Sequence, residues 1–212
     1  MTFSIEGKTP LQFWEGLYAN ASDETSGNPS TALARFAKDR TPGRALDLGC
    51  AKGDDAVWLA KQGWQVLGVD IAPAALRHAA ANAARNNVTV RFEQHDLSQS
   101  FPEGSFDLIS ANFLQTPFDL PWADIVRHAA KALRPGGLLL AVTHERVAPW
   151  AWSDSEQALP NAKDRFADLA LPQSDWHQLY VGPVDRMASG PDGQQAQVRD
   201  AVIALERGMK TN

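Results

Sequence analysis

The sequence predicts an α/β protein whose core is a mostly parallel sheet with helices on both faces. Two observations lead to this prediction. Between residues 43 and 143, short apolar runs alternate with helical patterns, which is typical of successive βαβ units. After residue 145 the pattern changes to two β-like runs separated by the turn-forming sequence SGPDG, which indicates an antiparallel hairpin. We expect this hairpin to close the far edge of the sheet.

Two helices are expected ahead of the sheet. Apolar and aromatic residues recur at helical spacing between residues 9 and 20. A polar loop follows, and a second helix is expected from residue 29 or 30 through residue 38.

The strands and helices of the sheet follow in alternation. The expected strands are 45–48, 65–69, 88–92, 106–111 and 138–143, and the expected helices are 54–62, 73–85 and 122–133. Residues 145–175 are expected to be loop with one helix. The hairpin strands are expected at 176–184 and 194–205, with Pro191 and Gly193 in the turn.

Length and charge narrow the class of protein. The chain has 212 residues, which suits a single domain with a sizeable core. Its net charge is −5, and it contains no dense block of Lys and Arg. Proteins that hold a nucleic-acid backbone rely on clustered cations, so we expect no nucleic-acid partner. A local basic patch is still compatible with the acidic total.

Three features favour a cytoplasmic protein. Cys50 is the only cysteine, so no internal disulfide is possible and a reducing compartment fits. The first residues lack the charged start and apolar core of a secretory signal. The longest apolar run, Leu138 to Val142, is too short to span a bilayer, so we expect no membrane partner.

The stretch RALDLGCAKGDDAVWLAKQGWQVLGVDIAP carries the clearest functional signal. Ligands of wound parallel sheets bind beyond the carboxyl ends of the strands. Asp47, Gly49 and Gly53 follow the first expected strand, and glycine there permits a tight turn and close approach of a ligand. The free N–H groups of the next helix suit a carboxylate or phosphate. Asp70 ends the second strand, where an acid can accept both hydroxyls of a ribose.

These residues predict a nucleoside-containing cofactor, and the spacing narrows the choice. A dinucleotide site needs G-x-G-x-x-G, but counting from Gly49 places Ala51 and Asp54 at the later glycine positions. Asp54 at the helix start would repel a pyrophosphate. A P-loop is excluded because no Gly-Lys-Ser/Thr closes the turn. A ligand with a ribose and one small anionic group fits, and S-adenosylmethionine has that shape.

The motifs that follow resemble one family in order. LDLGCAKG and VLGVD resemble the first two motifs of the class I S-adenosylmethionine-dependent methyltransferases. RFEQHDLSQ, FDLISANFLQ and ALRPGGLLLAV resemble its later segments, so the likeness covers residues 44–143. The resemblance implies a Rossmann-like fold with a seven-stranded, mostly parallel sheet, helices on both faces and an antiparallel C-terminal hairpin. It also implies S-adenosylmethionine as methyl donor and S-adenosylhomocysteine as product.

A finer likeness concerns one branch of that family. The segments FWEGLYA and SGNPS, the tripeptide THE and the sequence SGPDGQQAQVRDAVIALER look like a bacterial small-molecule branch similar to the tellurite-resistance and thiopurine methyltransferases. This likeness implies a small-molecule acceptor. It also implies one domain over 1–212, with a helical lid in 1–42, a cofactor-binding core in 43–144 and a substrate-side loop and hairpin in 145–212.

The resemblance assigns cofactor contacts to particular positions. The backbone of Gly49 meets the methionyl amine, Asp47 orients that region, and N–H groups near Lys52 and Gly53 face the carboxylate. On the adenosine side the expected contacts are Asp70, Ile71, Asp96 and Leu97. The small residues of the turn, Cys50 and Ala51, are also expected to contact the cofactor.

Some of these positions have competing interpretations. Asp70 could instead be the N-cap of the helix at Pro73, and Asp96 a plain loop acid. Cys50 is expected to be a buried small residue rather than a reactive thiol. His95 is expected at the surface. Ala51 replaces the commoner glycine of the motif, which should narrow the turn without abolishing binding.

Trp14 and Tyr18 have two interpretations. They either pack the first helix onto the core or belong to a lid whose aromatic faces stabilise the sulfonium. In the resembling branch this helix and the SGNPS loop cover the cofactor, which makes Asn28 and Pro29 candidates for the rim.

The active-site end of the sheet contributes further candidates. Asn112 is expected to contact the cofactor and is a candidate catalytic residue, while Phe113 and Gln115 lie beside it. His144 ends the fifth strand and is a candidate general base or substrate contact, although lone histidines are more often structural. Trp150 and Trp152 either wall a substrate pocket or anchor a long loop. No metal site is expected.

The sequence leaves several alternatives open. A base is needed only if the acceptor carries a proton, and a soft sulfur, selenium or tellurium acceptor would need none. A non-catalytic S-adenosylmethionine-binding regulator is the main rival, and a nicotinamide-dependent oxidoreductase is disfavoured by Asp54. The acceptor atom and the oligomeric state, monomer or dimer, stay open.

Overall fold

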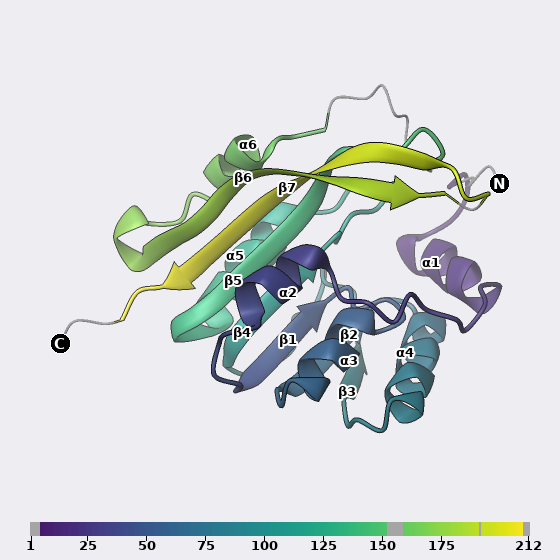
Figure 1. Cartoon of the computed structure of the whole chain (residues 1–212), viewed down its shortest axis with the longest axis horizontal. Coiled ribbons are helices and arrows are strands. Elements are labelled where there is room, and N and C mark those ends of the chain that lie inside the picture. The colour runs from purple at the N-terminus through teal and green to yellow at the C-terminus, as the bar shows by residue number, and fades with distance from the viewer. Residues whose placement is uncertain (1–4, 152–158, 191, 210–212) are drawn as a thin grey trace.

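The computed structural model describes residues 5–151, 159–190 and 192–209 and arranges them around one seven-stranded sheet. The strand order is β3-β2-β1-β4-β5-β7-β6. Strands β1 to β5 are parallel, whereas β7 is antiparallel to β5 and to β6 (Figure 1). The expected parallel sheet with an antiparallel C-terminal hairpin is therefore confirmed. Trp152 and Pro191 lie outside the described residues.

The expected elements are present with shifted ends. The strands are β1 Arg44–Leu48, β2 Gln65–Asp70, β3 Arg91–Gln94, β4 Phe106–Asn112, β5 Leu133–Arg146, β6 Trp176–Ser189 and β7 Gln195–Arg207. The helices are α1 Pro10–Ala19, α2 Thr31–Ala37, α3 Asp54–Lys61, α4 Pro73–Arg85, α5 Trp122–Ala132 and α6 Ala162–Asp168, with a short 3₁₀ turn at Gln173–Asp175.

Two strand boundaries differ from the prediction for local reasons. The third strand begins at Arg91 because Val88 still takes part in closing the end of α4, where its N–H donates to the carbonyl of Ala83. Asn87, directly before Val88, has a φ of +54°, a left-handed conformation that ends the helix. The fifth strand begins five residues early because Leu133 already pairs with Phe106, and the register shifts before Leu138 takes up the regular ladder.

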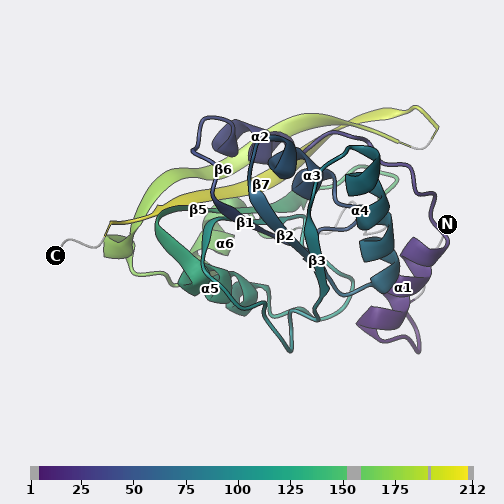
Figure 2. The same cartoon turned by 90° about the horizontal axis from the view of Figure 1, so that it is seen from below.

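Helices cover both faces of the sheet (Figure 2). Helices α2, α3 and α4 lie on one face, and α5 and α6 lie on the other. The side chains of β5 divide between the two cores accordingly: Leu139 and Ala141 pack with residues of α5, whereas Leu140 and Val142 pack with residues of α2 and α3. This alternation identifies the face to which each polar residue at the strand ends belongs.

Helix α1 packs against α4, beside the carboxyl ends of the parallel strands (Figure 1). Its N-terminus carries a capping box, because Thr9 and Gln12 each accept a hydrogen bond from the other's backbone N–H. Proline at the first helical position has the φ angle that a helix start requires. Within the described ranges, no helix is both long enough and apolar enough to cross a membrane.

Candidate active site

The turn after β1 is held tightly against β2. The N–H groups of Gly49 and Cys50 both donate to the carbonyl of Val69, at 2.8 and 2.9 Å. Gly49 has a φ of +70°, and a Cβ there would lie 2.9 Å from Leu114 Cδ1. The backbone conformation therefore favours glycine at this position, and an added Cβ would also require the Leu114 side chain to shift.

Ala51 occupies the middle of the same turn in a left-handed conformation, with a φ of +49°. Its N–H donates to Asp70 Oδ2 at 3.0 Å, which fixes the turn to the end of β2. The alanine that departs from the family pattern is thus accommodated at the cost of backbone strain, about 1–2 kcal/mol for a residue with a Cβ.

The Asp70 carboxylate joins the two loops at the carboxyl ends of β1 and β2. Besides the bond from Ala51, its Oδ1 accepts the N–H of Ala72 at 2.9 Å. Helix α4 begins after Ala72 without a side-chain cap, so Asp70 is not its N-cap. Asp70 is only 8% exposed, and burial raises the pKa of its carboxyl.

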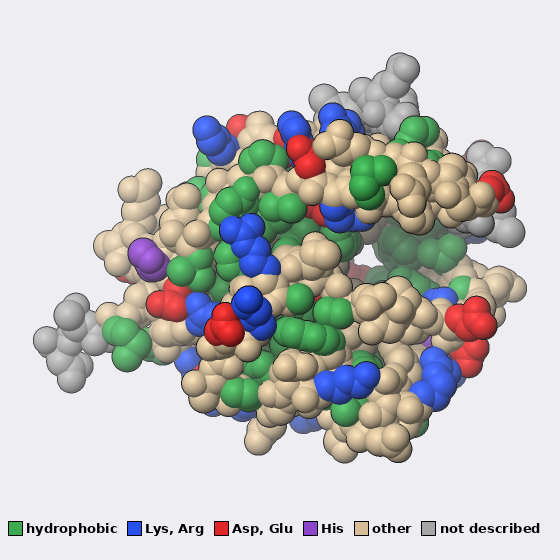
Figure 3. Space-filling view, in the orientation of Figure 1, with side chains coloured by type: hydrophobic (Ala, Val, Ile, Leu, Met, Phe, Trp, Pro, Cys, Tyr) green, Lys and Arg blue, Asp and Glu red, His purple; other side chains and the backbone are tan. Residues whose placement is uncertain are grey.

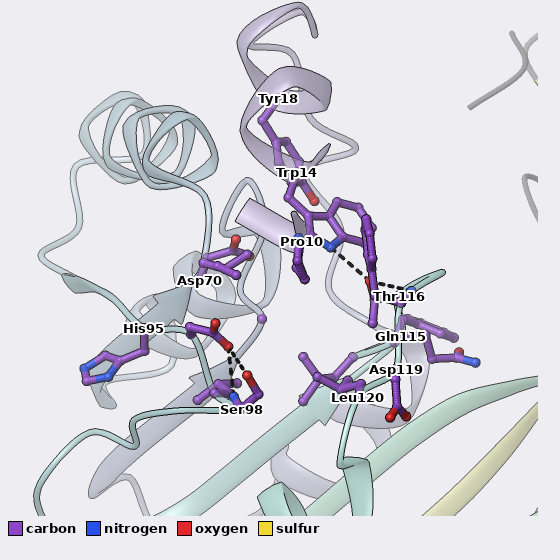
Figure 4. A pocket seen from close by; sticks show the side chains of 17 residues that line it. Pro10, Trp14, Tyr18, Asp70, His95, Ser98, Gln115, Thr116, Asp119 and Leu120 are labelled. Carbon is purple, nitrogen blue, oxygen red and sulfur yellow. Dashed lines mark hydrogen bonds between the residues drawn. The ribbon is translucent and has the colours of Figure 1, made fainter. Parts of the chain in front are cut away.

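A cavity of about 120 Å³ opens above this turn. It brings together most of the residues expected on the adenosine side and in the lid (Figure 4). Its lining includes Trp14, Tyr18, Gly49, Asp70, Ile71, Asp96, Leu97 and Phe113. His95 also borders it, but its ring points away, toward Glu93 and Ser100.

A second hollow lies on the other side of Gly49 and shares Tyr18, Gly49 and Phe113 with the first. The two therefore form one continuous cleft. The second part is lined by Asn28, Pro29, Asp47, Cys50, Ala51, Gly53, Asp54, Asp55, Asn112 and Arg186, among others. The surface is hollowed below the distal half of the β6–β7 hairpin, where Arg186 reaches this part of the cleft (Figure 3).

Buried carboxylates line the second part of the cleft. Asp47 is 3% exposed and accepts one hydrogen bond, from Ser110 Oγ at 3.0 Å. Burial and the neighbouring Asp55 raise the pKa of Asp47 to about 8. Asp55 accepts from the N–H of Ser30 at 2.6 Å and from Asn112 Nδ2 at 2.8 Å, and burial also raises its pKa. A cationic group bound here would stabilise both ionised carboxylates.

Asp55 was not among the expected site residues. The signal that points to it is the doubled acid directly after Gly53, at the start of α3, where Asp54 and Asp55 form the first turn. Of the N–H groups near Lys52 and Gly53 that are expected to face a ligand carboxylate, that of Gly53 donates to the carbonyl of Cys50 at 2.8 Å. The side chain of Cys50 is buried, and burial raises the pKa of its thiol, which agrees with the unreactive role expected for it.

Asn112 and Phe113 end β4 at the junction of the two parts of the cleft. Asn112 donates to Asp55, which leaves its Oδ1 buried and without a hydrogen-bond partner among the described residues. Phe113 has a φ of +56°, a strained conformation for an aromatic residue. Unpaired buried acceptors and backbone strain of this kind are concentrated at functional sites.

Helix α1 lines the first part of the cleft. Trp14 Nε1 donates to Thr116 Oγ1 at 3.3 Å (Figure 4). The Trp14 ring is stacked with the Tyr18 ring, and their centroids are 6.1 Å apart. Glu15 accepts the N–H of Ala74 at the start of α4, at 2.7 Å, and pairs with Arg77. The buried residue of α1 is instead Phe13, whereas Trp14 and Tyr18 line the first part of the cleft.

His144 lies beyond the wall formed by Phe113. Their ring centroids are 4.5 Å apart, and the His144 N–H donates to Gln115 Oε1 at 2.7 Å. Its Nδ1 lies 3.2 Å from Asp200 Oδ1, and Asp200 also pairs with Arg186. No local pattern in the hairpin sequence distinguishes these two residues. Trp150 is not among the residues that line the two parts of the cleft.

Comparison with known proteins agrees with this geometry. Residues 24–181 match a family model described as "Methyltransferase domain". Ribosomal protein L11 methyltransferase from Thermus thermophilus is 36% identical over 158 residues, covering 65% of this chain and 57% of that protein. Ribosomal RNA small subunit methyltransferase C from Alcanivorax borkumensis is 34% identical over 120 residues, covering 53% of this chain and 36% of that protein. The chain thus spans about half or less of the length of these relatives.

Solved structures share the fold at low sequence identity. The structure described as "Conversion of a Disulfide Bond into a Thioacetal Group during Echinomycin Biosynthesis" has a TM-score of 0.71 at 21% identity, covering 95% of this chain and 94% of the other. N-methyltransferase NodS from Bradyrhizobium japonicum, in complex with S-adenosylhomocysteine, has a TM-score of 0.67 at 20% identity, covering 94% and 98%. TehB from Haemophilus influenzae has a TM-score of 0.63 at 17% identity, covering 92% and 67%.

Proposed function

We propose that this chain, which belongs to the methyltransferase-domain family, transfers a methyl group from S-adenosylmethionine to a small-molecule acceptor. The observation that carries the proposal is the continuous cleft at the carboxyl edge of the sheet. One part of it carries two acids suited to a nucleoside, and the other carries buried acids suited to a cation.

The adenosine half would be held by Asp70 and Asp96. Asp96 Oδ1 is already engaged by the N–H and hydroxyl of Ser98, at 3.0 and 2.6 Å, which leaves Oδ2 to accept the adenine amino group. Asp70 is oriented by two backbone N–H groups, and its remaining acceptor capacity suits the ribose hydroxyls. Ile71 and Leu97 supply apolar walls for the base.

The methionyl half would be held by the second part of the cleft. An ammonium group donates three hydrogen bonds, and the unpaired Oδ1 of Asn112 is a buried acceptor without a donor among the described residues. Asp47 and Asp55 beside it supply the compensating negative charge. The N–H of Gly49 donates to the carbonyl of Val69, so the part of the Gly49 backbone that can bind the ammonium group is its carbonyl.

The reaction itself requires mainly alignment. S-adenosylmethionine, when bound, supplies a methyl group already activated by the sulfonium, so displacement needs an acceptor placed in line behind it. Tyr18 and Phe113 lie where the two parts of the cleft meet, and their aromatic faces suit a sulfonium. Asn112 and His144 are the residues that we place on the acceptor side.

The shape and charge of the cleft favour a small acceptor over a nucleic acid. Helix α1 contributes Trp14 and Tyr18 to the lining of the cleft, and the β6–β7 hairpin contributes Arg186. Among the side chains that line its second part, Lys52 is bonded to the carbonyls of Ser22 and Glu24, and Arg186 is paired with Asp200. Neither is free to neutralise a phosphate backbone. The ribosomal substrates in the names of the sequence relatives therefore do not transfer to this chain in our proposal.

Thermal unfolding with S-adenosylmethionine, S-adenosylhomocysteine, NAD or no ligand tests the cofactor assignment. A ligand at about 100 times its Kd adds about 2.7 kcal/mol, which is roughly 5–10 °C for a chain of this size. We expect a rise with the first two ligands only. A rise with NAD alone would contradict the proposal. Binding of S-adenosylmethionine without S-adenosylhomocysteine formation on any small-molecule acceptor would favour a regulatory module.

A further inference from the structure

A row of polar residues crosses the sheet on the face covered by α2 and α3. At successive strands it consists of Asp47 on β1, Asn112 on β4, His144 on β5, Asp200 on β7 and Arg186 on β6. All five residues lie on the same face as Val142 and Val202, according to the alternation along each strand. The first two residues belong to the proposed methionyl site, and Arg186 also lines that part of the cleft, whereas His144 and Asp200 lie beyond it.

The outer three residues form a hydrogen-bonded cluster. Asp200 has a side chain that is 5% exposed, and it receives Arg186 Nε at 2.6 Å on Oδ2. Its Oδ1 lies 3.2 Å from His144 Nδ1. Because Nδ1 is engaged, the proton-accepting position of His144 is Nε2, for which the described part of the chain provides no hydrogen-bond partner. The His144 side chain is 29% exposed; His144 does not itself line the cleft, but its ring is stacked on Phe113, which lines both parts of it.

The backbone supports this orientation. Register between β5 and β7 shifts between His144 and Arg146, so Glu145 is an extra residue in the ladder. Such bulges redirect side chains and are frequent next to active sites. The backbone N–H of His144 donates to Gln115 Oε1. The His144 ring is stacked on that of Phe113, a residue that lines both parts of the cleft.

We propose that His144 is the general base of the methyl transfer and that Asp200 is its positioning residue, so that the acceptor is a nucleophile that carries a proton: an amine, a hydroxyl or a thiol. This inference rests on the proposed function. It narrows the acceptor class, because an acceptor without a proton has no use for a base.

The proposed step balances as follows. The lone pair of the acceptor forms a bond to the methyl carbon, and the bond between that carbon and sulfur breaks with its electrons on sulfur. The acceptor's proton passes to His144 Nε2 and later to solvent. The buried Asp200 carboxylate stabilises the imidazolium, as in other His–Asp pairs. Arg186 holds Asp200 in place through its Nε.

Variants with matched probes test the inference. Formation of S-adenosylhomocysteine is measured with three proton-bearing acceptors, benzylamine, catechol and 2-mercaptoethanol, and with two proton-free acceptors, iodide and dimethyl selenide. We expect the unmodified chain to methylate at least one proton-bearing acceptor. His144→Gln should lower kcat for it at least 100-fold. Turnover of any proton-free acceptor should change less than threefold, since no proton is removed.

Asp200→Asn tests the positioning role. We expect an intermediate loss of kcat, about tenfold to 100-fold, confined to the proton-bearing acceptors, with the KM for S-adenosylmethionine unchanged. A merely structural role would lower turnover of both acceptor types together. His177→Gln, on an exposed position of the same hairpin, is the control and should leave all rates unchanged. Thermal unfolding of each variant verifies that it is folded.

The remaining outcomes separate this inference from the proposed function. Turnover of proton-free acceptors only, or equal rates for His144→Gln and the unmodified chain, would overturn the role of His144 and leave methyl transfer intact. Methylation of none of the probes, with S-adenosylmethionine still bound in calorimetry, would overturn the inference together with the small-molecule acceptor. Failure to bind S-adenosylmethionine would contradict the cofactor assignment itself.

Discussion

At the residue scale, the site is defined by side chains and backbone angles that are unfavourable in the free protein. The carboxylates of Asp47 and Asp55 are buried and repel each other. Ala51 and Phe113 adopt left-handed backbone conformations. Each of these features costs stability, and each lies at the cleft. The free protein should therefore gain stability from substitutions that relieve them.

Ala51→Gly tests the backbone strain. Glycine adopts a positive φ without a Cβ penalty, so we expect the free energy of unfolding to rise by about 1 kcal/mol, net of the greater entropy of the unfolded chain. Urea unfolding measures the change. Ala80→Gly, at an exposed position within α4, is the matched control and should lower stability by about 1 kcal/mol. Destabilisation by Ala51→Gly would contradict the assigned strain.

Asp47→Asn tests the electrostatics. The pKa of Asp47 is about 8 in the folded chain and near 3.9 in an unfolded one, so between these values folding retains a proton that unfolding releases. Stability of the free protein should therefore fall as pH rises from about 4 to 8. In Asp47→Asn, the decrease of stability with rising pH should be smaller by up to about 1.4 kcal/mol per pH unit. The variant should also bind S-adenosylmethionine more weakly.

Urea unfolding at pH 5, 6.5 and 8 without cofactor measures the slope for Asp47→Asn. Asparagine can still accept the hydrogen bond from Ser110, so the comparison isolates the charge. Asp124→Asn, at an exposed position of α5, serves as the control. Parallel stability curves for Asp47→Asn and the unmodified chain would show that Asp47 is not the group responsible.

At the element scale, α1 packs against α4 and lines the first part of the cleft, which suits it to act as a lid. Its polar anchors include the bond from Ala74 to Glu15 at the N-terminus of α4 and the bond from Trp14 to Thr116. An acid at a helix N-terminus is stabilised by the unpaired N–H groups there. The anchor at Glu15 is exposed enough to break without unfolding the sheet.

Glu15→Ala should loosen this lid. We expect the loss of about 1 kcal/mol of local stability, which corresponds to about fivefold faster hydrogen exchange of the α1 amides and faster dissociation of S-adenosylmethionine. Exchange in β1 should stay unchanged. Mass spectrometry of exchange and stopped-flow dissociation measure the two effects, with Glu103→Ala in an exposed loop as control. Unchanged dissociation would exclude a lid function for α1.

At the scale of the whole molecule, charge and shape determine the class of partner. The net charge is −5, and the cleft is lined by more acids than free cations among the described residues. The protein should therefore show no measurable affinity for ribosomal RNA at 0.15 M salt, where phosphate-binding proteins depend on released counterions. Fluorescence anisotropy with labelled RNA tests this. Micromolar binding that weakens steeply with salt would return the acceptor to the nucleic acids.

Much of the fold was predictable from local patterns. The alternation of apolar runs and helical periods located the five parallel strands, and Pro73 with the alanine-rich run after it defined α4 to the residue. Errors occurred where a boundary depended on pairing: Val88 was assigned to a strand but closes a helix, and Leu133 was assigned to a helix but pairs with Phe106.

The sequence by itself determined the glycine turn and the acids at the ends of β1 and β2, because these signals lie within one βαβ unit. It also determined the family, because the motifs follow one another in order over residues 44–143. Only the tertiary structure brings His144, Asp200 and Arg186 together in one cluster. His144 and Asp200 are 56 positions apart, and their contact depends on the register with which the hairpin adds to β5. Periodicity indicates which face of a strand is buried, but the register that aligns two distant strands is set by the packing of the whole sheet.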